Sequence, residues 1–401
     1  MRIGRVVAVS IWVLGCGPTP APPRQPTPAP PPAASPEVPD PAPTAVAEVE
    51  QPVVEQPKLV PCEAHQAPSP LAYLKGQVHV HTERSFDAAT PVPEVIEFFA
   101  GRRYDFLAIT DHNHITIPKD HPSGMLLIPG VELTYNATAC DPPPHPGYLC
   151  AFHTNVLFLN PLRDATRGKH FILPFRKNRL EVFQVLQRRA DDLEGILVLN
   201  HPTYHYAVDE VLLDELVNRG IRFVEFFNGS VMDHNKDGPE AEIEKSEQLW
   251  DAMLTRGHQV LAVGADDAHH FADAATIRMT GKKPLYGDRS WIMVRSERTP
   301  EAIRQAMVDG DYYVSTGVEL ANVLLSEATV HVTIDAKEGE SYVTRFIGHG
   351  GDILARVEGP EACYPVTGSE GYVRAVVESD TGKYAWTQAM MLNRSGPVVA
   401  P

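Results

Sequence analysis

The sequence has few cysteines and few basic residues for its length. Among 401 residues there are 5 cysteines, and 35 lysine and arginine residues stand against 51 aspartate and glutamate residues, which gives a net charge of −16. This excess of negative charge argues against nucleic acid as a tightly held partner. It does not exclude a phosphorylated small-molecule substrate, because bound divalent cations reverse the local electric field.

Several catalytic and structural signatures are also missing. The sequence contains neither a Gly-x-Ser-x-Gly nucleophile elbow nor a phosphate-binding glycine-rich loop, so nothing in it supports nucleophilic serine catalysis. It shows no internal repeat and no coiled-coil heptad pattern. With 43% hydrophobic residues, the chain is nevertheless able to bury a barrel core and a small second domain.

The N-terminus is typical of an exported protein. A basic stretch at residues 1–5 precedes a short apolar run, Val6–Leu14, which fits a secretory signal and is too short for a membrane span. The next residues resemble a bacterial lipobox with Cys16 as the lipid-modified residue, and ordinary cleavage or a retained anchor are the alternatives. Residues 17–60 are so rich in proline that they favour extended conformations and bury no core. We therefore expect a membrane-anchored lipoprotein of the cell envelope, periplasmic or at the cell surface.

The four other cysteines are an even number in an oxidising compartment, which favours disulfides. Four cysteines allow three pairings. Cys140 and Cys150 flank a turn-rich loop whose ends are able to meet, so we expect these two to pair and Cys62 to pair with Cys363. Free buried thiols are the alternative.

Apolar runs alternate with helical patterns along the middle of the chain. Candidate strands lie near residues 78, 107, 128, 157, 198, 224, 261 and 293. The helical patterns cover residues 92–102, 179–193, 208–219, 240–256 and 299–308. Such alternation predicts parallel βα units, and a barrel of these units keeps its chemistry at the C-terminal ends of the strands. An open doubly wound sheet is the alternative from the pattern alone.

Histidines and carboxylates recur where these apolar runs end. Residues 78–81 alternate between apolar and polar, so a strand here would project His79 and His81 to one face, where two imidazoles can bind one cation. Other runs lead to His112, Glu132, His201, Asp267 and His269 in the same way. In the Asp266–Asp267 doublet, only Asp267 has the spacing that puts it on the same side of an extended segment as His269. Without a bound ion, these histidines and carboxylates at strand ends would lack partners.

Together these motifs resemble the PHP (polymerase and histidinol phosphatase) superfamily of metal-dependent hydrolases, and most closely its carbaryl hydrolase-like branch. The motifs are His-x-His followed by Thr and an acidic residue, Ile-Thr-Asp-His, Gly-Val-Glu, Leu-Asn-His-Pro and Asp-Ala-His, over about residues 74–320. The resemblance implies an α/β fold, a distorted (β/α)7 barrel with two or three metal ions. Many relatives carry Ser-Asp-Gly after His-x-His, whereas Asp87 stands one position later here.

The resemblance also implies three groups of metal ligands. A first ion would be held by His79, His81, Glu132 and Asp267, a second by Glu132 as a bridge with His153 and His201, and a third by Asp87, His112 and His269. Imidazoles and carboxylates without thiolate suit Zn, Mn or Fe, and the set is too rich in nitrogen for Ca or Mg.

Two or three such ions would lower the pKa of a bridging water and neutralise charge in a transition state. We therefore predict a hydrolase, most favourably a phosphoesterase acting on a small molecule, in which Glu132 and Asp267 hold the metals that activate the water. A carbamate, amide or ester hydrolase is one alternative, and a non-catalytic metal-containing binding protein at the cell surface is another. Asp111 is a candidate to orient an imidazole, Asn228 to face the site and Arg84 to assist a phosphate.

Beyond about residue 320 the pattern changes. Short alternating segments at 330–334, 341–347 and 371–377, separated by turns, predict a small antiparallel β unit. The predicted organisation is a lipoprotein signal peptide (1–16), a proline-rich disordered linker (17–60), a PHP-like metallohydrolase domain (61–320), and a small β domain with a loose tail (321–401).

Overall fold

The computed structural model describes residues 69–118, 121–144, 149–166, 168–204 and 207–392. The predicted signal peptide, the lipobox at Cys16, the proline-rich linker and the C-terminal tail lie outside these ranges. Within the part of the chain that is described, no helix is both long enough and apolar enough to cross a membrane.

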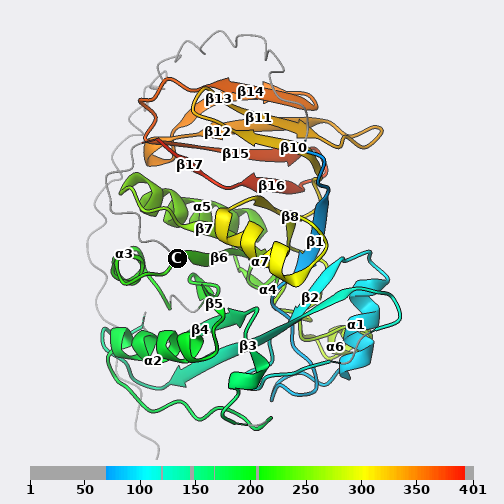
Figure 1. The fold of residues 1–401 in the computed structure, drawn as a ribbon, viewed down its shortest axis with the longest axis vertical. Helices are drawn as coiled ribbons and strands as arrows, with labels where there is room; N and C mark the ends of the chain where they lie inside the picture. The colour runs from blue at the N-terminus through cyan, green and yellow to red at the C-terminus, as the bar shows by residue number, and fades with distance from the viewer. Residues whose placement is uncertain (1–68, 119–120, 145–148, 167, 205–206, 393–401) are drawn as a thin grey trace, which may run out of the picture. The chain divides into compact units, whose positions relative to one another are not determined.

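Nine strands and seven α-helices, with a short 3-10 helix at Pro161–Arg163, make up the described chain before residue 320 (Figure 1). The strands are β1 (Tyr73–Gln77), β2 (Phe106–Ile109), β3 (Leu126–Ala137), β4 (Cys150–Leu157), β5 (Ile196–Leu199), β6 (Phe223–Asn228), β7 (Leu261–Ala265), β8 (Trp291–Arg295) and β9 (Tyr312–Ser315). The helices are α1 (Val92–Ala100), α2 (Arg179–Asp192), α3 (Glu210–Asn218), α4 (Gly229–His234), α5 (Pro239–Thr255), α6 (Ala274–Met279) and α7 (Pro300–Asp309). A strand lies at or next to each of the eight predicted positions, the first ending at Gln77 just before residue 78, and all five predicted helices are present. Helices α4 and α6 were not predicted because each is only one to two turns long and leaves too short a pattern.

Polar side chains fix where several helices begin. Asn178 accepts hydrogen bonds from the first backbone N–H groups of α2, and Asp209, Asn228 and Thr299 do the same for α3, α4 and α7. These side chains satisfy donors that have no partner within the helix. Helix α7 ends at Gly310, whose φ of 79° lies in the left-handed region that glycine adopts without steric cost.

The sheet around the predicted site mixes parallel and antiparallel pairs. Strands β1, β2 and β3 are parallel, as are β5, β6 and β7, whereas β4 runs antiparallel to both β3 and β5, and β8 runs antiparallel to β1 and β9. The predicted α/β class with parallel βα units is confirmed. The antiparallel pairs made by β4 and β8 depart from an otherwise parallel arrangement of β1 to β7.

Strand β7 approaches β9 without pairing with it in the described chain. A Cβ atom at Gly264 would lie 2.2 Å from Cγ1 of Val314, so only glycine permits this approach. The side chain of Gln388 hydrogen-bonds both the N–H and the C=O of Ala262 at 2.9 Å. Side chains therefore satisfy backbone groups at this edge of the sheet that a neighbouring strand would otherwise pair.

The C-terminal strands are antiparallel, as predicted (Figure 1). They are β10 (Leu320–Leu325), β11 (Thr329–Ile334), β12 (Tyr342–Ile347), β13 (Ile353–Glu358), β14 (Glu361–Pro365), β15 (Tyr372–Ser379), β16 (Tyr384–Thr387) and β17 (Met390–Met391), with a 3-10 helix at His349–Gly351. Strands β10, β11 and β14 form a separate sheet, while β16, β15, β12 and β13 continue the large sheet from β9. The segment beyond residue 320 is thus joined to the preceding one by strand pairing.

A buried ion pair also connects the two segments. Arg374 in β15 donates two hydrogen bonds to Asp251 in α5, at 2.7 and 2.6 Å, and Tyr372 donates a third at 2.8 Å. Arg374 is fully buried. Because an unpaired buried charge is strongly unfavourable, this pair ties α5 to β15.

The predicted disulfide between Cys140 and Cys150 is confirmed. It joins the end of the β3 segment to the first residue of β4, beside the strands that carry Glu132 and His153. Cys62 lies outside the described residues, so its pairing with Cys363 stays a prediction.

Candidate metal centre

His79 and His81 follow the end of β1 and are not part of it. The strand ends at Gln77, and Val80 forms only a single parallel bridge with Ala268. The prediction that residues 78–81 are a strand was therefore wrong, because the chain pairs there with the segment after β7 for one residue only. The two imidazoles still lie close together, with ring centroids 5.2 Å apart, and both are fully buried.

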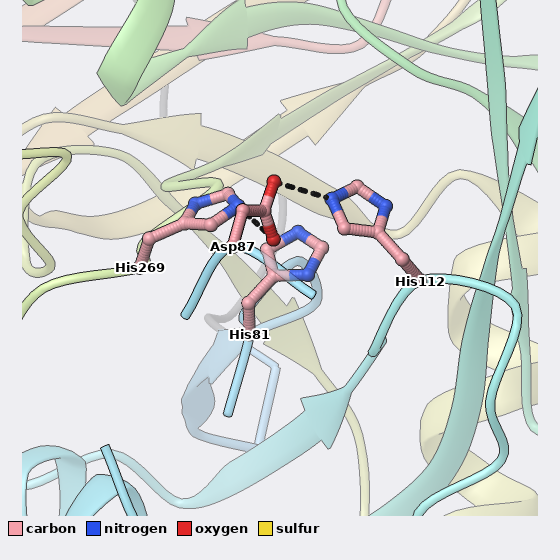
Figure 2. Close-up of side chains that lie close together, drawn as sticks. All are labelled: His81, Asp87, His112 and His269. Atoms are coloured by element: carbon pink, nitrogen blue, oxygen red, sulfur yellow. Dashed lines mark hydrogen bonds and ion pairs between the residues drawn. The ribbon is translucent and has the colours of Figure 1, made fainter. Parts of the chain in front are cut away.

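One group of donors surrounds Asp87 (Figure 2). The Oδ2 atom of Asp87 lies 3.2 Å from Nε2 of His112, and its Oδ1 atom lies 3.4 Å from Nε2 of His269. One donor atom from each of these residues and one from His81 all lie within 4.8 Å of one another. The carboxylate reaches the two imidazoles although it stands one position later in the sequence than in many PHP proteins.

Two further groups adjoin the first. His79, His81 and Asp267 form one, with the Asp267 Oδ1 atom 3.4 and 3.1 Å from the two Nε2 atoms. The other consists of Glu132, His153 and His201. The structure thus brings together all nine residues that the sequence analysis singled out.

Glu132 lies between the groups. Its carboxylate oxygens are 3.5 Å from Nε2 of His79 and of His81, 3.1 Å from Nδ1 of His153 and 3.6 Å from Nε2 of His201. It was expected at the end of a strand but stands within β3, because β3 pairs with β2 only as far as Pro129 and then continues against β4. It nevertheless lies beyond the end of β2, where the other donors are.

Two of the candidate ligands have left-handed backbone conformations. The φ angle is 26° at His201 and 54° at Asp267. Non-glycine residues rarely adopt such angles, and those that do are concentrated at functional sites. The prediction that the segment from Asp267 to His269 is extended is therefore wrong. The two side chains meet because the backbone turns, and the Nδ1 atom of His269 lies 2.9 Å from the Asp267 carbonyl oxygen.

The two aspartates of the doublet have different surroundings. Asp266 accepts hydrogen bonds from the backbone N–H groups of Asp288, Arg289 and Ser290 and from the Gln77 amide, so its carboxylate is engaged away from the donor groups. Asp267 faces the imidazoles. The geometry agrees with the choice of Asp267 as the candidate ligand.

Glu225 is a buried carboxylate that sequence reasoning did not single out. Its Oε1 atom lies 2.8 Å from Nδ1 of His79, and its Oε2 atom accepts hydrogen bonds from the His201 N–H and the Asn228 amide, both at 3.0 Å. A carboxylate at the second nitrogen of a ligand histidine fixes the orientation of the ring. The signal in the sequence was a lone carboxylate within the apolar run of β6.

The three secondary candidates differ in position. Asp111 accepts hydrogen bonds from Ser85 Oγ and Thr82, and Ser85 in turn hydrogen-bonds Nδ1 of His81, so Asp111 reaches an imidazole only through Ser85. The Asn228 amide lies 3.4 Å from Asp267 and thus faces the site. Arg84 is exposed and lines a neighbouring surface pocket.

Burial and neighbouring charged groups shift the pKa values of several residues in the site. Burial lowers the pKa of His81 to about 3, with help from the neighbouring His269 and His112. Burial alone would lower the pKa of His112 as well, but the Glu132 carboxylate and the hydrogen bond to Asp87 raise it to about 10. Burial opposes ionisation of Glu132, yet the histidines around it hold its pKa well below the usual range.

The donor atoms suit divalent transition-metal ions. Six imidazoles and three carboxylates match the preferences of Zn, Mn or Fe. Two donor atoms that each lie about 2.2 Å from the same ion are at most about 4.4 Å apart. The donor atoms of each group lie within 4.8 Å of one another, which is close to that limit. Among the described residues, buried Nε2 of His79 and Oε2 of Glu132 have no hydrogen-bond partner, although His112 Nδ1 lies 2.6 Å from the latter. Bound cations would satisfy both atoms.

Comparisons with known proteins show distant structural similarity. No family model matches the sequence, and no curated protein matches it significantly. The structure resembles a two-domain protein from Bacteroides vulgatus containing a predicted PHP-like metal-dependent phosphoesterase, with 16% identity and a TM-score of 0.43 over 81% of this chain and 90% of that one.

Two other solved structures resemble a smaller part of the chain. One is an amidohydrolase from Chromobacterium violaceum with bound sulfate and no metal, at 16% identity and a TM-score of 0.30 over 48% of this chain and 87% of that one. The other is a metal-dependent phosphoesterase, described as putative, from Bifidobacterium adolescentis, at 13% identity and a TM-score of 0.33 over 51% and 90%.

Proposed function

We propose that this protein is a metal-dependent phosphoesterase that hydrolyses small phosphate esters. The observation that supports the proposal is the gathering of nine imidazole and carboxylate donors, Glu132 among them, in three adjoining groups. Bound divalent ions would supply a water of lowered pKa and neutralise charge on phosphoryl oxygens.

The charge of the site favours an anionic substrate. The three carboxylates of the donor set balance half the charge of three divalent ions, and the adjacent Glu225 carboxylate balances one further charge, which leaves a positive excess when three ions are bound. A positive centre attracts a phosphate ester and stabilises the additional negative charge of its transition state more than that of a neutral carbamate. This argument ranks a phosphoester above the carbamate, amide or ester substrates that form the second candidate class.

Residues of the chain fix the donors in place. Glu225 holds Nδ1 of His79, which turns Nε2 of that ring toward Glu132 and Asp267. Thr134 hydrogen-bonds Nδ1 of His112, which turns Nε2 of that ring toward Asp87. Such prior orientation lowers the reorganisation that binding and reaction require.

The experiment is a substrate panel with the protein loaded with Mn or Zn. We expect hydrolysis of p-nitrophenyl phosphate or nucleotide phosphates that is lost in Asp267→Ala. Faster turnover of an aryl carbamate or carboxylic ester than of every phosphoester would favour the second class. Absence of turnover of both classes by fully metallated protein would favour a binding protein.

Histidine variants separate ligands from other histidines. His81→Ala and His201→Ala should lose both turnover and bound metal. His258→Ala and His331→Ala are matched controls, because these rings pair with Asp214 and Glu361 outside the donor groups. Equal metal content in all four variants would contradict the ligand assignment.

A further inference from the structure

The donor residues differ in their exposure to solvent. The side chain of Asp87 is 40% exposed, whereas that of Asp267 is 15% exposed and that of Glu132 is fully buried. A substrate therefore reaches the donors at Asp87. The residues beside this carboxylate would contact the part of a substrate that stays outside the donor groups.

Phe86 stands directly before Asp87 and is a large apolar residue in an exposed position. Its side chain is 71% exposed, and its ring stacks on the His112 imidazole with centroids 4.6 Å apart and an angle of 18° between the planes. One face of the phenyl ring thus covers a candidate metal ligand. The exposure of the side chain leaves the opposite face uncovered, although a phenyl ring in water is unfavourable.

A second aromatic ring lies beside another candidate ligand. Tyr204 is 38% exposed, and its ring meets that of His201 edge-on, with centroids 5.2 Å apart and an angle of 74°. Single exposed apolar residues are common on protein surfaces. Here, however, two partly exposed aromatic rings contact two different histidines of one donor centre.

We propose that Phe86 and Tyr204 bind the organic group of the substrate, and that this group is a planar aromatic ring such as an aryl group or a nucleobase. The inference rests on the proposed phosphoesterase function and adds to it the class of the leaving group. The uncovered face of Phe86 offers a stacking surface next to the open carboxylate, and aromatic rings prefer offset-stacked or edge-on contacts with one another. A phosphate ester of glycerol lacks a ring that can use this surface.

The test compares phenyl phosphate with glycerol 2-phosphate in the metal-loaded full-length protein. Phe86→Ala should raise KM for phenyl phosphate about three- to tenfold, the range expected for loss of one stacking contact, and change KM for glycerol 2-phosphate less than about twofold. The kcat values should stay close to those of the wild type, because a contact equal in ground and transition states affects KM alone. Tyr204→Leu should have the same selective effect and Tyr204→Phe should not.

Two further variants guard against indirect effects. Phe86→Leu keeps an apolar group over His112 but removes the planar ring. It should therefore also lose the preference for phenyl phosphate over glycerol 2-phosphate, while its metal content stays that of the wild type. Phe175→Ala is the matched control, since Phe175 is 68% exposed and its ring stacks on Tyr135, which is not a candidate ligand, with centroids 6.5 Å apart and an angle of 29° between the planes. It should behave like the wild type.

Binding measurements decide the inference even without turnover. Calorimetry with phenylphosphonate and methylphosphonate should show tighter binding of the phenyl compound, and Phe86→Ala should abolish that difference. Equal weakening of both phosphonates, or no weakening, would overturn the aromatic subsite. Absence of phosphoester hydrolysis combined with a Phe86-dependent preference for phenylphosphonate would instead count against the proposed function and leave the subsite in place.

Discussion

The Nδ1 atom of His79 lies 2.8 Å from the Oε1 atom of Glu225, and both side chains are buried. This pair places a carboxylate behind a candidate metal ligand. Glu225→Gln should weaken metal binding about 10- to 100-fold, because the amide keeps the shape but loses the charge that orients the imidazole. Competition with a chromophoric chelator measures the change. Glu370→Gln removes another buried carboxylate, whose hydrogen bonds within the described residues are to Tyr364, Thr367 and Gly368 of the C-terminal segment, and it should bind metal like the wild type.

The aspartate doublet should separate metal binding from stability. Asp267→Ala should lose bound metal. Asp266→Ala should still bind metal, because the nine candidate ligands are unchanged. It should lower the free energy of unfolding by more than about 2 kcal/mol, because the backbone N–H groups of residues 288–290 lose their acceptor. Elemental analysis and urea unfolding of the metal-free proteins measure the two effects. The assignment would be contradicted by loss of metal without loss of stability in Asp266→Ala.

Metal affinity should rise with pH. A histidine must lose its proton to bind a metal, and Glu132 and Asp87 raise the pKa of His112 to about 10 despite burial. The protonated ring therefore stabilises the metal-free fold fully below the ordinary histidine pKa of about 6.5, and this contribution fades as the pH rises toward about 10. Zn affinity should increase through the same interval. A titration series between these pH values measures the slope, which His112→Gln should reduce.

The ion pair between Asp251 and Arg374 should contribute to stability across the segment boundary at residue 320. Asp251→Ala should lower the free energy of unfolding by about 3–5 kcal/mol, because the buried guanidinium of Arg374 loses two hydrogen bonds and keeps the more distant carboxylate of Glu247, at 3.6 Å. Urea unfolding followed by tryptophan fluorescence measures this change. The double variant Asp251→Leu with Arg374→Met should recover much of the loss. A small effect of Asp251→Ala alone would mean that Glu247 or water compensates the charge of the arginine.

Anchoring through Cys16 is proposed from the sequence alone. Cys16→Ser should move the protein from the detergent-extracted membrane fraction to the soluble fraction, because the acceptor of the lipid is removed. Immunoblots of fractionated cells measure the shift. An unchanged membrane fraction would point to a retained apolar anchor at residues 6–14.

The sequence determined the local structure and most of the candidate site. Apolar runs and helical periodicity located the predicted strands and helices, because the period of side-chain burial differs between the two. The resemblance of ordered motifs selected nine residues that the structure gathers in one place. The loop between Cys140 and Cys150 is short, so their pairing was also visible from sequence.

Only the tertiary structure decided how distant residues are combined. Sequence spacing did not reveal that Glu225 orients His79, that Ser85 stands between Asp111 and His81, or that the backbone turns at Asp267. These features depend on contacts between segments that follow or belong to different strands, or on a left-handed backbone angle. The sequence likewise did not show that strands beyond residue 320 continue the large sheet, since the direction and partner of a strand are set by long-range pairing and not by its own periodicity.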